Sequence, residues 1–423
     1  KKFFRDGIQT MDKPIFNIIN KKFIISVVTS STFITGFTIA VIWFYLSNID
    51  RLDIFFDAVN LSSTLGIIFF FILLSISGFS LIIFISSFIL ILIYSGYENK
   101  LKVYSSITHR ISTVCYQNSL FICCLLIIAY YIYYMTKWNG YIITAFSIIS
   151  IFIHSYVTCA IRLFRKQKSR LNNTVRYEKL SRKKGFNFWL SLQLIIPGVV
   201  QILPMMFLFN QLNFSEGTSD WYEMSILIAI TVVIVTIGIL PGIIHINERQ
   251  NGNKMTGIIV VLIFIPVATA ALSVWYRPIP NMIANMTMNL SGISDQRTHE
   301  YYIERATHPA GMFNGKIWNT RYYKNIPDRF FITGVNTFTL GNIKLICPTA
   351  IVKARIESLK FTVNDIDEYE QKGKKLKKTA MKCIPFDKND IHTWDSPLSE
   401  PIYYEKIKQT IDNSMLKILH VVK

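Results

Sequence analysis

The chain has 423 residues, of which 51% are hydrophobic, and its formal net charge at pH 7 is +19. Together with a positive mean hydropathy, this apolar content excludes an ordinary soluble domain. The charged residues lie between the long apolar runs, before the first run and in residues 276–423, and none lies inside a run. This distribution argues against a nucleic-acid-binding groove, and we expect no nucleic acid as a partner.

The first 22 residues predict a helix lying at a membrane interface. Asp12 is a capping residue, Pro14 suits a first helical turn, and an apolar stripe precedes Lys21 and Lys22. A simple positioned tail is the alternative. No cleavable signal peptide is expected, because the first apolar run is too long for one and lacks a small-residue cleavage site.

Apolar runs long enough, or nearly so, to cross a hydrocarbon core of about 30 Å predict a bundle of about seven transmembrane helices over residues 23–275. The runs are 23–46, 63–94, 119–135, 141–161, 188–210, 224–245 and 256–275. The second run would form a helix roughly 48 Å long. We expect it to be a single tilted or extended helix, because two crossings would leave no turn between them.

Residues 162–185 determine the expected orientation. They contain ten Lys/Arg and one acidic residue, Glu178, and such a segment resists translocation across a membrane. The segments then assigned to the cytoplasm hold 21 Lys/Arg, and they are 1–22, 95–118, 162–185 and 246–254. The short loops assigned to the outer side hold only two, and they are 47–60, 136–140 and 211–223. The N-terminus is therefore predicted in the cytoplasm and the C-terminal domain outside it.

Spans five to seven contain prolines paired with glycines, at Pro197-Gly198 and Pro241-Gly242. One hypothesis is a transport site between broken helices, with a cavity lined by His154, Gln193, Pro197, Gln201 and Pro241. The favoured interpretation is tolerated kinks in a packed bundle, because Pro197 lies mid-span and Pro241 near the inner end.

Residues 276–423 predict a soluble α+β domain with a small antiparallel sheet. Its expected elements are a short helix at 295–308, a hairpin within 336–347, a strand at 350–357, a solvated loop at 364–382 and an amphipathic helix at 404–422. The hairpin has the clearest signal. A two-residue Gly341-Asn342 loop pairs Leu340 with Ile343 and Phe338 with Leu345 on one face.

Four ionisable residues of the expected helix at 295–308 form the most catalytic-looking group in the chain. His299, Glu300, Glu304 and His308 include three residues at helical spacing. On a helix, Glu300 and His308 would be about 12 Å apart, too far to share an ion, and the pattern is not HExxH. A solvated helix face is favoured, and a metalloenzyme using His299, Glu304 and His308 is kept as an alternative. No cofactor or metal is expected.

Cys347 and Cys383 are the only cysteines of the predicted outer domain. An even pair in an oxidising compartment predicts a disulfide. Two unpaired buried thiols are the alternative. The other four cysteines lie in or beside the apolar runs, where thiols act as small apolar packing groups.

These observations lead to three functional hypotheses. The first is a non-catalytic bacterial inner-membrane protein that contacts lipids and binds a protein partner through its periplasmic domain. The frequent use of Ile, Phe, Lys, Asn and Tyr in the chain indicates an AT-rich gene, which favours a role in toxin immunity or defence on a mobile element. The second is a transporter or channel, and the third is the metalloenzyme. No motif names a reaction, and a homo-oligomer is left open.

Overall fold

The computed structural model describes residues 30–59, 62–101, 105–161, 184–250, 254–322 and 327–395. The predicted helices at 1–22 and 404–422 lie outside these residues. The described residues form two compact units. The first contains the chain up to Ser75, Asn281–Ser358 and the described residues from Glu370 onward, and the second contains Ile76–Pro280 and Leu359–Tyr369. The predicted boundary between a transmembrane bundle and a soluble domain at residue 276 stays a prediction.

Six described helical segments are long and apolar enough to cross a membrane. They are α2 (Ser31–Asn48), α4 (Ser62–Leu101), α5 (Ser105–Thr136), α6 (Gly140–Cys159), the broken segment Trp189–Phe209 and α12 (Asp220–Gln250). The last predicted run forms α13 (Lys254–Trp275), whose described apolar stretch is Phe264–Val274. Trp43, Trp138 and Trp221 are all exposed, as tryptophans of an interfacial belt would be.

The second apolar run forms one continuous helix of 40 residues, α4, as predicted. It contains no proline that could interrupt its backbone hydrogen bonds. Its serines at positions 75, 80, 86 and 87 are buried, so they mark close contacts with neighbouring chain segments and not a turn between two crossings.

The fifth span is broken into three short helices. These are α9 (Lys184–Gln193), α10 (Ile196–Val200) and α11 (Ile202–Phe209). Pro197 lies in the first turn of α10, where a missing N–H is tolerated. By contrast, Pro241 and Pro266 lie inside α12 and α13, which continue through them.

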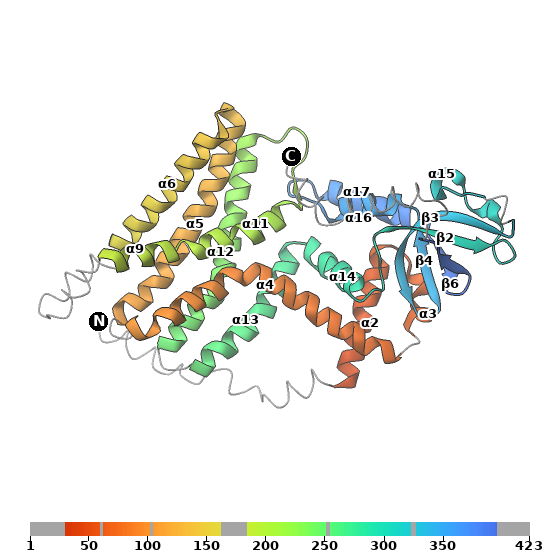
Figure 1. Cartoon of the computed structure of the whole chain (residues 1–423), viewed down its shortest axis with the longest axis horizontal. Coiled ribbons are helices and arrows are strands. Elements are labelled where there is room, and N and C mark those ends of the chain that lie inside the picture. Colours follow the sequence, from red (N-terminus) through yellow and green to blue (C-terminus); the bar gives the residue numbers. More distant parts are fainter. Residues whose placement is uncertain are drawn as a thin grey trace, which may run out of the picture. The chain divides into compact units, whose positions relative to one another are not determined.

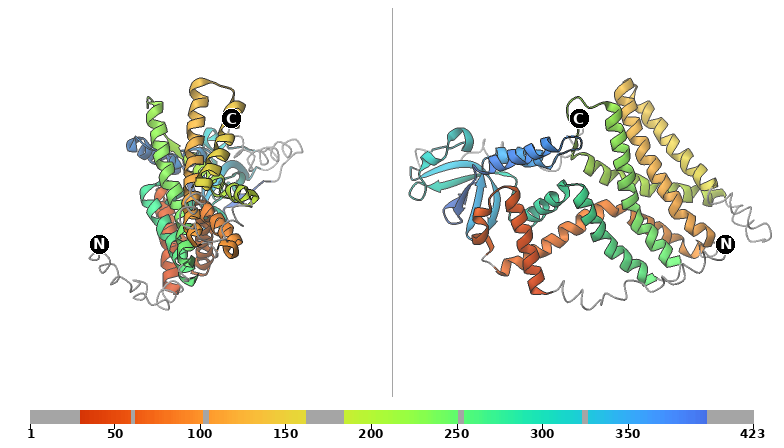
Figure 2. Two further views of the ribbon diagram at one scale, coloured as in Figure 1. Left: turned by 90° about the vertical axis from the view of Figure 1, so that its left-hand side faces the viewer. Right: turned by 180° about the vertical axis from the view of Figure 1, so that it is seen from behind.

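Helices α5, α6 and α12 of the second unit run side by side (Figures 1 and 2). Small residues permit the closest helix contacts in this unit. A Cβ at Gly238 of α12 would lie 2.8 Å from Gln201 Nε2 and 3.1 Å from the Ile83 carbonyl oxygen. A Cβ at Gly198 would lie 2.9 Å from Ser119 Cα. The spans therefore pack through glycine contacts, as in other membrane bundles.

The first unit contains a five-stranded antiparallel sheet with the order β6-β4-β3-β2-β7. The strands are β2 (Thr298–Glu304), β3 (Arg329–Leu340), β4 (Ile343–Cys347), β6 (Ile384–Asp387) and β7 (Ile391–Thr393). Lys344 Nζ of β4 lies 3.3 Å from Thr393 Oγ1 of β7, although β3 and β2 separate these strands. The sheet is therefore strongly curved.

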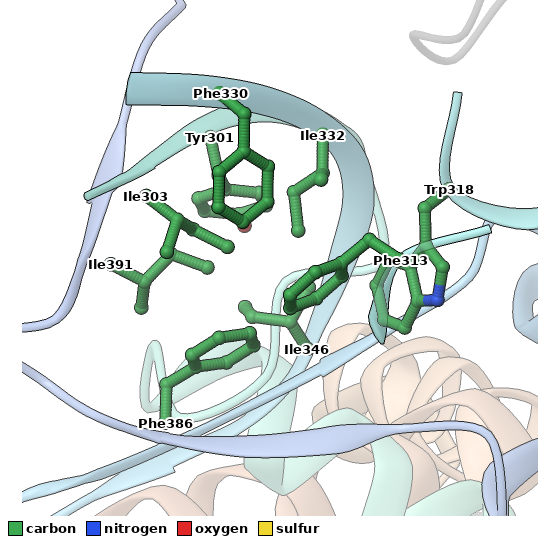
Figure 3. Packing of buried hydrophobic residues seen from close by; sticks show 9 residues of the cluster. All are labelled: Tyr301, Ile303, Phe313, Trp318, Phe330, Ile332, Ile346, Phe386 and Ile391. Carbon is green, nitrogen blue, oxygen red and sulfur yellow. The ribbon is translucent and has the colours of Figure 1, made fainter. Parts of the chain in front are cut away.

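The concave face of this sheet encloses an aromatic and aliphatic core, shown in Figure 3. Phe313 and Trp318 pack against it from the connection between β2 and β3. The core residues are Tyr301, Ile303, Phe313, Trp318, Phe330, Ile332, Ile346, Phe386 and Ile391. These side chains supply the hydrophobic driving force for the domain.

The structure also contains shorter helices and strands. They are η2 (Leu52–Ile54), α3 (Phe55–Val59), α14 (Pro278–Leu290), η4 (Ala310–Met312), α15 (Gly315–Trp318), α16 (Ala350–Leu359) and α17 (Ile366–Ala380). In the second unit, β1 (Leu212–Asn213) pairs in parallel with β5 (Phe361–Thr362).

The predicted hairpin is confirmed by the pairing of β3 with β4. Leu340 pairs with Ile343 and Phe338 with Leu345, and Gly341 has a φ of 68°, which the tight turn requires. The predicted disulfide joins Cys347 to Cys383. It connects the end of β4 to the residue before β6.

The predicted helix at 295–308 is wrong, because this segment contains strand β2. Tyr301 and Ile303 are 1% and 0% exposed and alternate with the less buried Glu300 and Tyr302. That period of two places alternate residues on opposite faces of a sheet. The charged residues that suggested a helix lie toward the ends of the strand or beyond it.

The predicted strand at 350–357 is also wrong, because these residues form helix α16. Its buried residues are Ile351, Ala354 and Arg355, and their spacing is helical. Ile356 is 52% exposed.

The predicted loop at 364–382 is wrong as well, because it contains helix α17. Asp365 accepts a hydrogen bond from the Glu368 amide at 2.9 Å and caps the helix. Acidic residues in the first turn and lysines in the last turn complement the helix dipole.

Candidate functional site

The convex face of the sheet, opposite the core, carries an aromatic cluster that we call the outer aromatic face. It consists of Tyr302, Phe331, His392 and Trp394 together with Arg329. Tyr302 on β2 pairs with Phe331 on β3 and with His392 on β7, so these three side chains share a face. Trp394 follows directly after β7.

The rings of this face contact one another closely. Tyr302 stacks on His392 at a centroid distance of 4.8 Å, and Trp394 lies edge-on to Tyr302 and Phe331 at 5.8 and 5.9 Å. Arg329 lies over the Tyr302 ring at 4.6 Å. Phe331 is buried, whereas His392 is exposed. The face therefore combines a fixed aromatic base with accessible edges.

Two ion pairs border the outer aromatic face. Arg321 contacts Glu300 at 2.7 Å and Arg329 contacts Glu304 at 3.5 Å. The indole Nε1 of Trp394 is buried and has no hydrogen-bond partner among the described residues. Aromatic and arginine side chains are enriched at protein-binding surfaces.

A histidine held between two carboxylates fixes the chain segment that carries Trp394. His299 Nδ1 lies 2.6 Å from Asp395 Oδ2, and His299 Nε2 lies 3.0 Å from Asp295 Oδ2. Because ionised carboxylates only accept hydrogen bonds, a carboxylate at each ring nitrogen favours the protonated, imidazolium form of His299. The Glu300 amide also donates to Asp395 at 3.2 Å, and the Trp394 amide donates to the Glu300 carbonyl oxygen at 2.6 Å.

We call the group formed by His299, Asp295 and Asp395 the clasp. The pKa shifts of its residues agree with its geometry. The hydrogen bond with Asp395 raises the pKa of His299 above 6.5, against the opposing effect of burial. Burial raises the pKa of Asp295, but hydrogen bonds from Arg297 and His299 outweigh that effect and lower it to about 2. Burial also lowers the pKa of the nearby Lys344, against the attraction of Asp395.

A buried polar cluster links helix α2 to the sheet and to α16. The Tyr45 hydroxyl donates to the Thr337 carbonyl oxygen at 2.7 Å and accepts from Arg355 Nη2 at 2.7 Å. Arg355 also donates to Ser294 at 3.4 Å, and its guanidinium lies over the Tyr45 ring at 5.2 Å. Arg355 is only 4% exposed. These contacts fix the end of a membrane-span helix to the sheet.

The residues expected to line a transport cavity are not brought together as one set. Gln201 is fully buried and accepts a hydrogen bond from Ser86 of α4. The Ser86 hydroxyl oxygen also lies 2.8 Å from the Pro197 carbonyl oxygen, and Pro197 and Pro241 are buried. Gln193 is half-buried on α9. His154 lies elsewhere, against Phe121 of α5.

The residues of the metalloenzyme alternative do not share a helix face. His299 lies at the start of β2 in the carboxylate clasp, and Glu304 lies at its end beside Arg329. His308 follows in a turn, where its ring packs against Phe386 at 5.1 Å. Within the described residues, no group of three or more His, Cys, Asp or Glu could hold a metal ion.

The sequence alone does not predict the outer aromatic face or the clasp. The available signals were the alternation within Thr298–Glu304 and the grouping of His392, Trp394 and Asp395 near the second cysteine. The contacts between these segments could not be predicted, because the pairing of β2 with β7 joins strands about 90 residues apart.

The fold defines a multi-pass α-helical membrane protein with an α+β region in its C-terminal part. No protein-family model, curated protein or solved structure matches the chain.

Proposed function

We propose that this protein is a membrane-anchored binding protein, in which the outer aromatic face recognises a protein partner outside the cytoplasm. The observation that carries the proposal is the outer aromatic face, in which Tyr302, His392 and Trp394 remain partly accessible on a rigid sheet. Tyr, Trp and Arg side chains dominate the binding energy of many protein interfaces. Placing them on paired strands limits the entropy lost on binding.

The contacts of the C-terminal region support an extracytoplasmic position. Within the first unit, Arg51 of the predicted outer loop at 47–60 donates to the Cys383 carbonyl oxygen at 2.6 Å. Within the second unit, Leu212 and Asn213 of another predicted outer loop pair with Phe361 and Thr362. Together with the lysine and arginine distribution, these contacts favour the side opposite the basic segment 162–185. The Cys347–Cys383 disulfide suits an oxidising compartment such as a bacterial periplasm.

Charge indicates the chemistry of the partner. Residues 276–423 contain 22 Lys/Arg and 15 Asp/Glu, a net charge of +7. The partner is therefore expected to present an acidic surface with apolar side chains at its centre. Toxin immunity or defence remains a hypothesis based on composition, and an adjacent toxin or defence gene would favour it.

Site-specific photocrosslinking of the full chain in its native membrane tests this function. A benzophenone amino acid at exposed His392 is expected to capture one protein, identified by mass spectrometry. The same probe at exposed Asn389, outside the aromatic face, serves as the control. Capture should be lost when Trp394→Ala is added. Equal capture at both positions, unchanged capture in the Trp394→Ala background, or no captured protein would contradict the proposal.

A further inference from the structure

The clasp holds the chain segment that carries Trp394 of the outer aromatic face. The Trp394 amide donates to the Glu300 carbonyl oxygen at 2.6 Å. Asp395, the next residue, accepts from the Glu300 amide at 3.2 Å through Oδ1, and its Oδ2 lies 2.6 Å from His299 Nδ1. The position of Trp394 is therefore coupled, through Asp395, to an ionisable imidazole.

One proton decides how many carboxylates His299 can hold. The imidazolium has two N–H donors, one for Asp395 at Nδ1 and one for Asp295 at Nε2, 3.0 Å away. The neutral ring has a single N–H, so one nitrogen would present a lone pair to a carboxylate. A hydrogen bond between two charged groups is also stronger than one to a neutral donor. Loss of the proton therefore weakens the clasp whichever nitrogen keeps its hydrogen.

The two carboxylates are anchored differently. Asp295 accepts from Arg297 Nη2 at 2.8 Å and from the Arg297 amide at 3.0 Å, and its own amide donates to the Asn336 carbonyl oxygen at 2.7 Å. By contrast, Asp395 follows the end of β7 by two residues. Because Asp295 is fixed by its own turn and by the sheet, we expect the loosening to fall on Asp395 and on Trp394 beside it.

Besides the two carboxylates, the ionisable groups near His299 are two cations and a phenol. Its partner on β3 is Gly334, which carries no charge. Arg297 stays charged throughout the range of histidine titration, and burial raises the pKa of Tyr301 above 10. Lys344 of β4 lies over the Tyr301 ring at 4.7 Å, and burial lowers the pKa of this lysine below 10.5. Variants must therefore separate His299 from Lys344.

We infer that His299 is a positioning residue through which pH controls partner binding: its protonated form holds Trp394 in the outer aromatic face, and its neutral form releases this residue. The inference rests on the proposed function, because the partner is the one that this face recognises. Trp394 lies edge-on to Tyr302 and Phe331 at 5.8 and 5.9 Å, so its displacement opens the face. The partner is therefore held in mildly acidic surroundings and released in mildly alkaline ones.

Fluorine NMR of the purified full chain, labelled with 5-fluorotryptophan, tests the coupling without a partner. Trp394→Phe identifies the Trp394 signal by its disappearance. The chemical shift of this signal should titrate with a midpoint above pH 6.5, because the hydrogen bond with Asp395 raises the pKa of His299. The titration should vanish in His299→Gln and persist in His392→Gln, which removes the histidine of the outer aromatic face. A constant signal from pH 5.5 to pH 9, or a titration that persists in His299→Gln, would overturn the inference.

A second variant keeps the test decisive if His299→Gln does not fold, as judged by gel filtration. Asp295→Asn removes one of the two carboxylates that stabilise the imidazolium, so the midpoint of the Trp394 signal should move to lower pH. A midpoint that Asp295→Asn leaves in place would contradict the role of His299.

Photocrosslinking from position 392 in native membranes tests the effect on the partner. Capture should be at least about threefold lower at pH 9 than at pH 6, and His299→Gln should remove this difference. Equal capture at both pH values in the chain that keeps His299 would overturn the inference and leave the proposed function standing. No capture at either pH would contradict the proposed function, and with it the pH control of binding.

Discussion

At the scale of single residues, the Tyr45 hydroxyl satisfies two buried groups at once. It donates to the Thr337 carbonyl oxygen and accepts from Arg355, whose guanidinium makes no ion pair with the described residues. A buried cation with only neutral partners depends strongly on each of them. This cluster is therefore sensitive to the loss of a single oxygen atom.

Replacing Tyr45 with Phe is expected to destabilise the protein by about 1–3 kcal/mol, because it leaves a carbonyl oxygen and a guanidinium N–H unpaired. The thermal midpoint in detergent, measured by circular dichroism, should fall clearly. Tyr134→Phe removes the hydroxyl of a tyrosine that is 60% exposed and provides a matched control. Equal midpoints for both variants would contradict the role of Tyr45.

Protonation of His299 predicts a pH dependence. Because the folded-state pKa of His299 is raised, its stabilising contribution is full below pH 6.5 and is lost as the pH rises through the folded-state value. Asp295, with its pKa lowered to about 2, contributes above pH 3.8 and loses that contribution as the pH falls through about 2. The clasp is therefore strongest between pH 3.8 and 6.5.

Thermal midpoints measured from pH 5 to pH 9 check the contribution of His299. The fall in the midpoint with rising pH should be smaller in His299→Gln than in the wild type. His392→Gln serves as the control, because His392 makes no ion pair with the described residues. A pH profile that His299→Gln leaves unchanged would show that the clasp does not respond to this proton.

At the scale of elements, the membrane helices depend on close backbone contacts. Gly238→Ala would place a Cβ 2.8 Å from Gln201 Nε2 and 3.1 Å from the Ile83 carbonyl oxygen. Because one of these atoms belongs to the backbone, the helices must separate, at a cost of about 1–3 kcal/mol. At Gly36 of α2 a Cβ meets nothing within 4 Å, so Gly36→Ala should be neutral.

Resistance to unfolding in increasing concentrations of sodium dodecyl sulfate distinguishes these two glycine variants. The Gly238→Ala transition should occur at lower detergent concentration than the wild type, and the Gly36→Ala transition should not move. If both variants behave as the wild type, the close contact between α12 and α4 does not contribute to stability.

The elements differ in how well the sequence predicts them. The apolar runs identify the spans, because hydrophobic length is set by the membrane. The hairpin was also predictable, because a two-residue Gly-Asn turn fixes the register of β3 and β4. Strand β2 is harder to predict, because the spacing of its charged residues favours a helix and only the alternation of Tyr301 and Ile303 indicates a strand.

The sequences of α16 and α17 contain helix signals, but competing patterns in the same segments favour a strand and a loop. In α16, the residues from Val352 to Ile356 satisfy a period of two, and only tertiary packing shows that Ile351, Ala354 and Arg355 are the buried set. In α17, Asp365 followed by Glu368 is a capping pattern that predicts a helix start. The outer aromatic face depends on long-range strand pairing and was therefore not predictable.

At the scale of the whole molecule, the proposed function depends on the side of the membrane on which the sheet lies. The proposed function assumes a position outside the cytoplasm, and the Cys347–Cys383 disulfide suits an oxidising compartment there. The basic segment 162–185 gives the sequence argument for this orientation. The contacts of Arg51 and of β1 with the C-terminal region agree with it.

Cysteine labelling in intact cells with a membrane-impermeant maleimide directly tests on which side of the membrane the sheet lies. Asn389, which is exposed on the sheet domain, and Asn172, within the basic segment, are each replaced by Cys. We predict labelling of Asn389→Cys in intact cells and of Asn172→Cys only after the membrane is permeabilised. Labelling of Asn172→Cys in intact cells, with Asn389→Cys protected until permeabilisation, would contradict the proposed orientation and the function built on it.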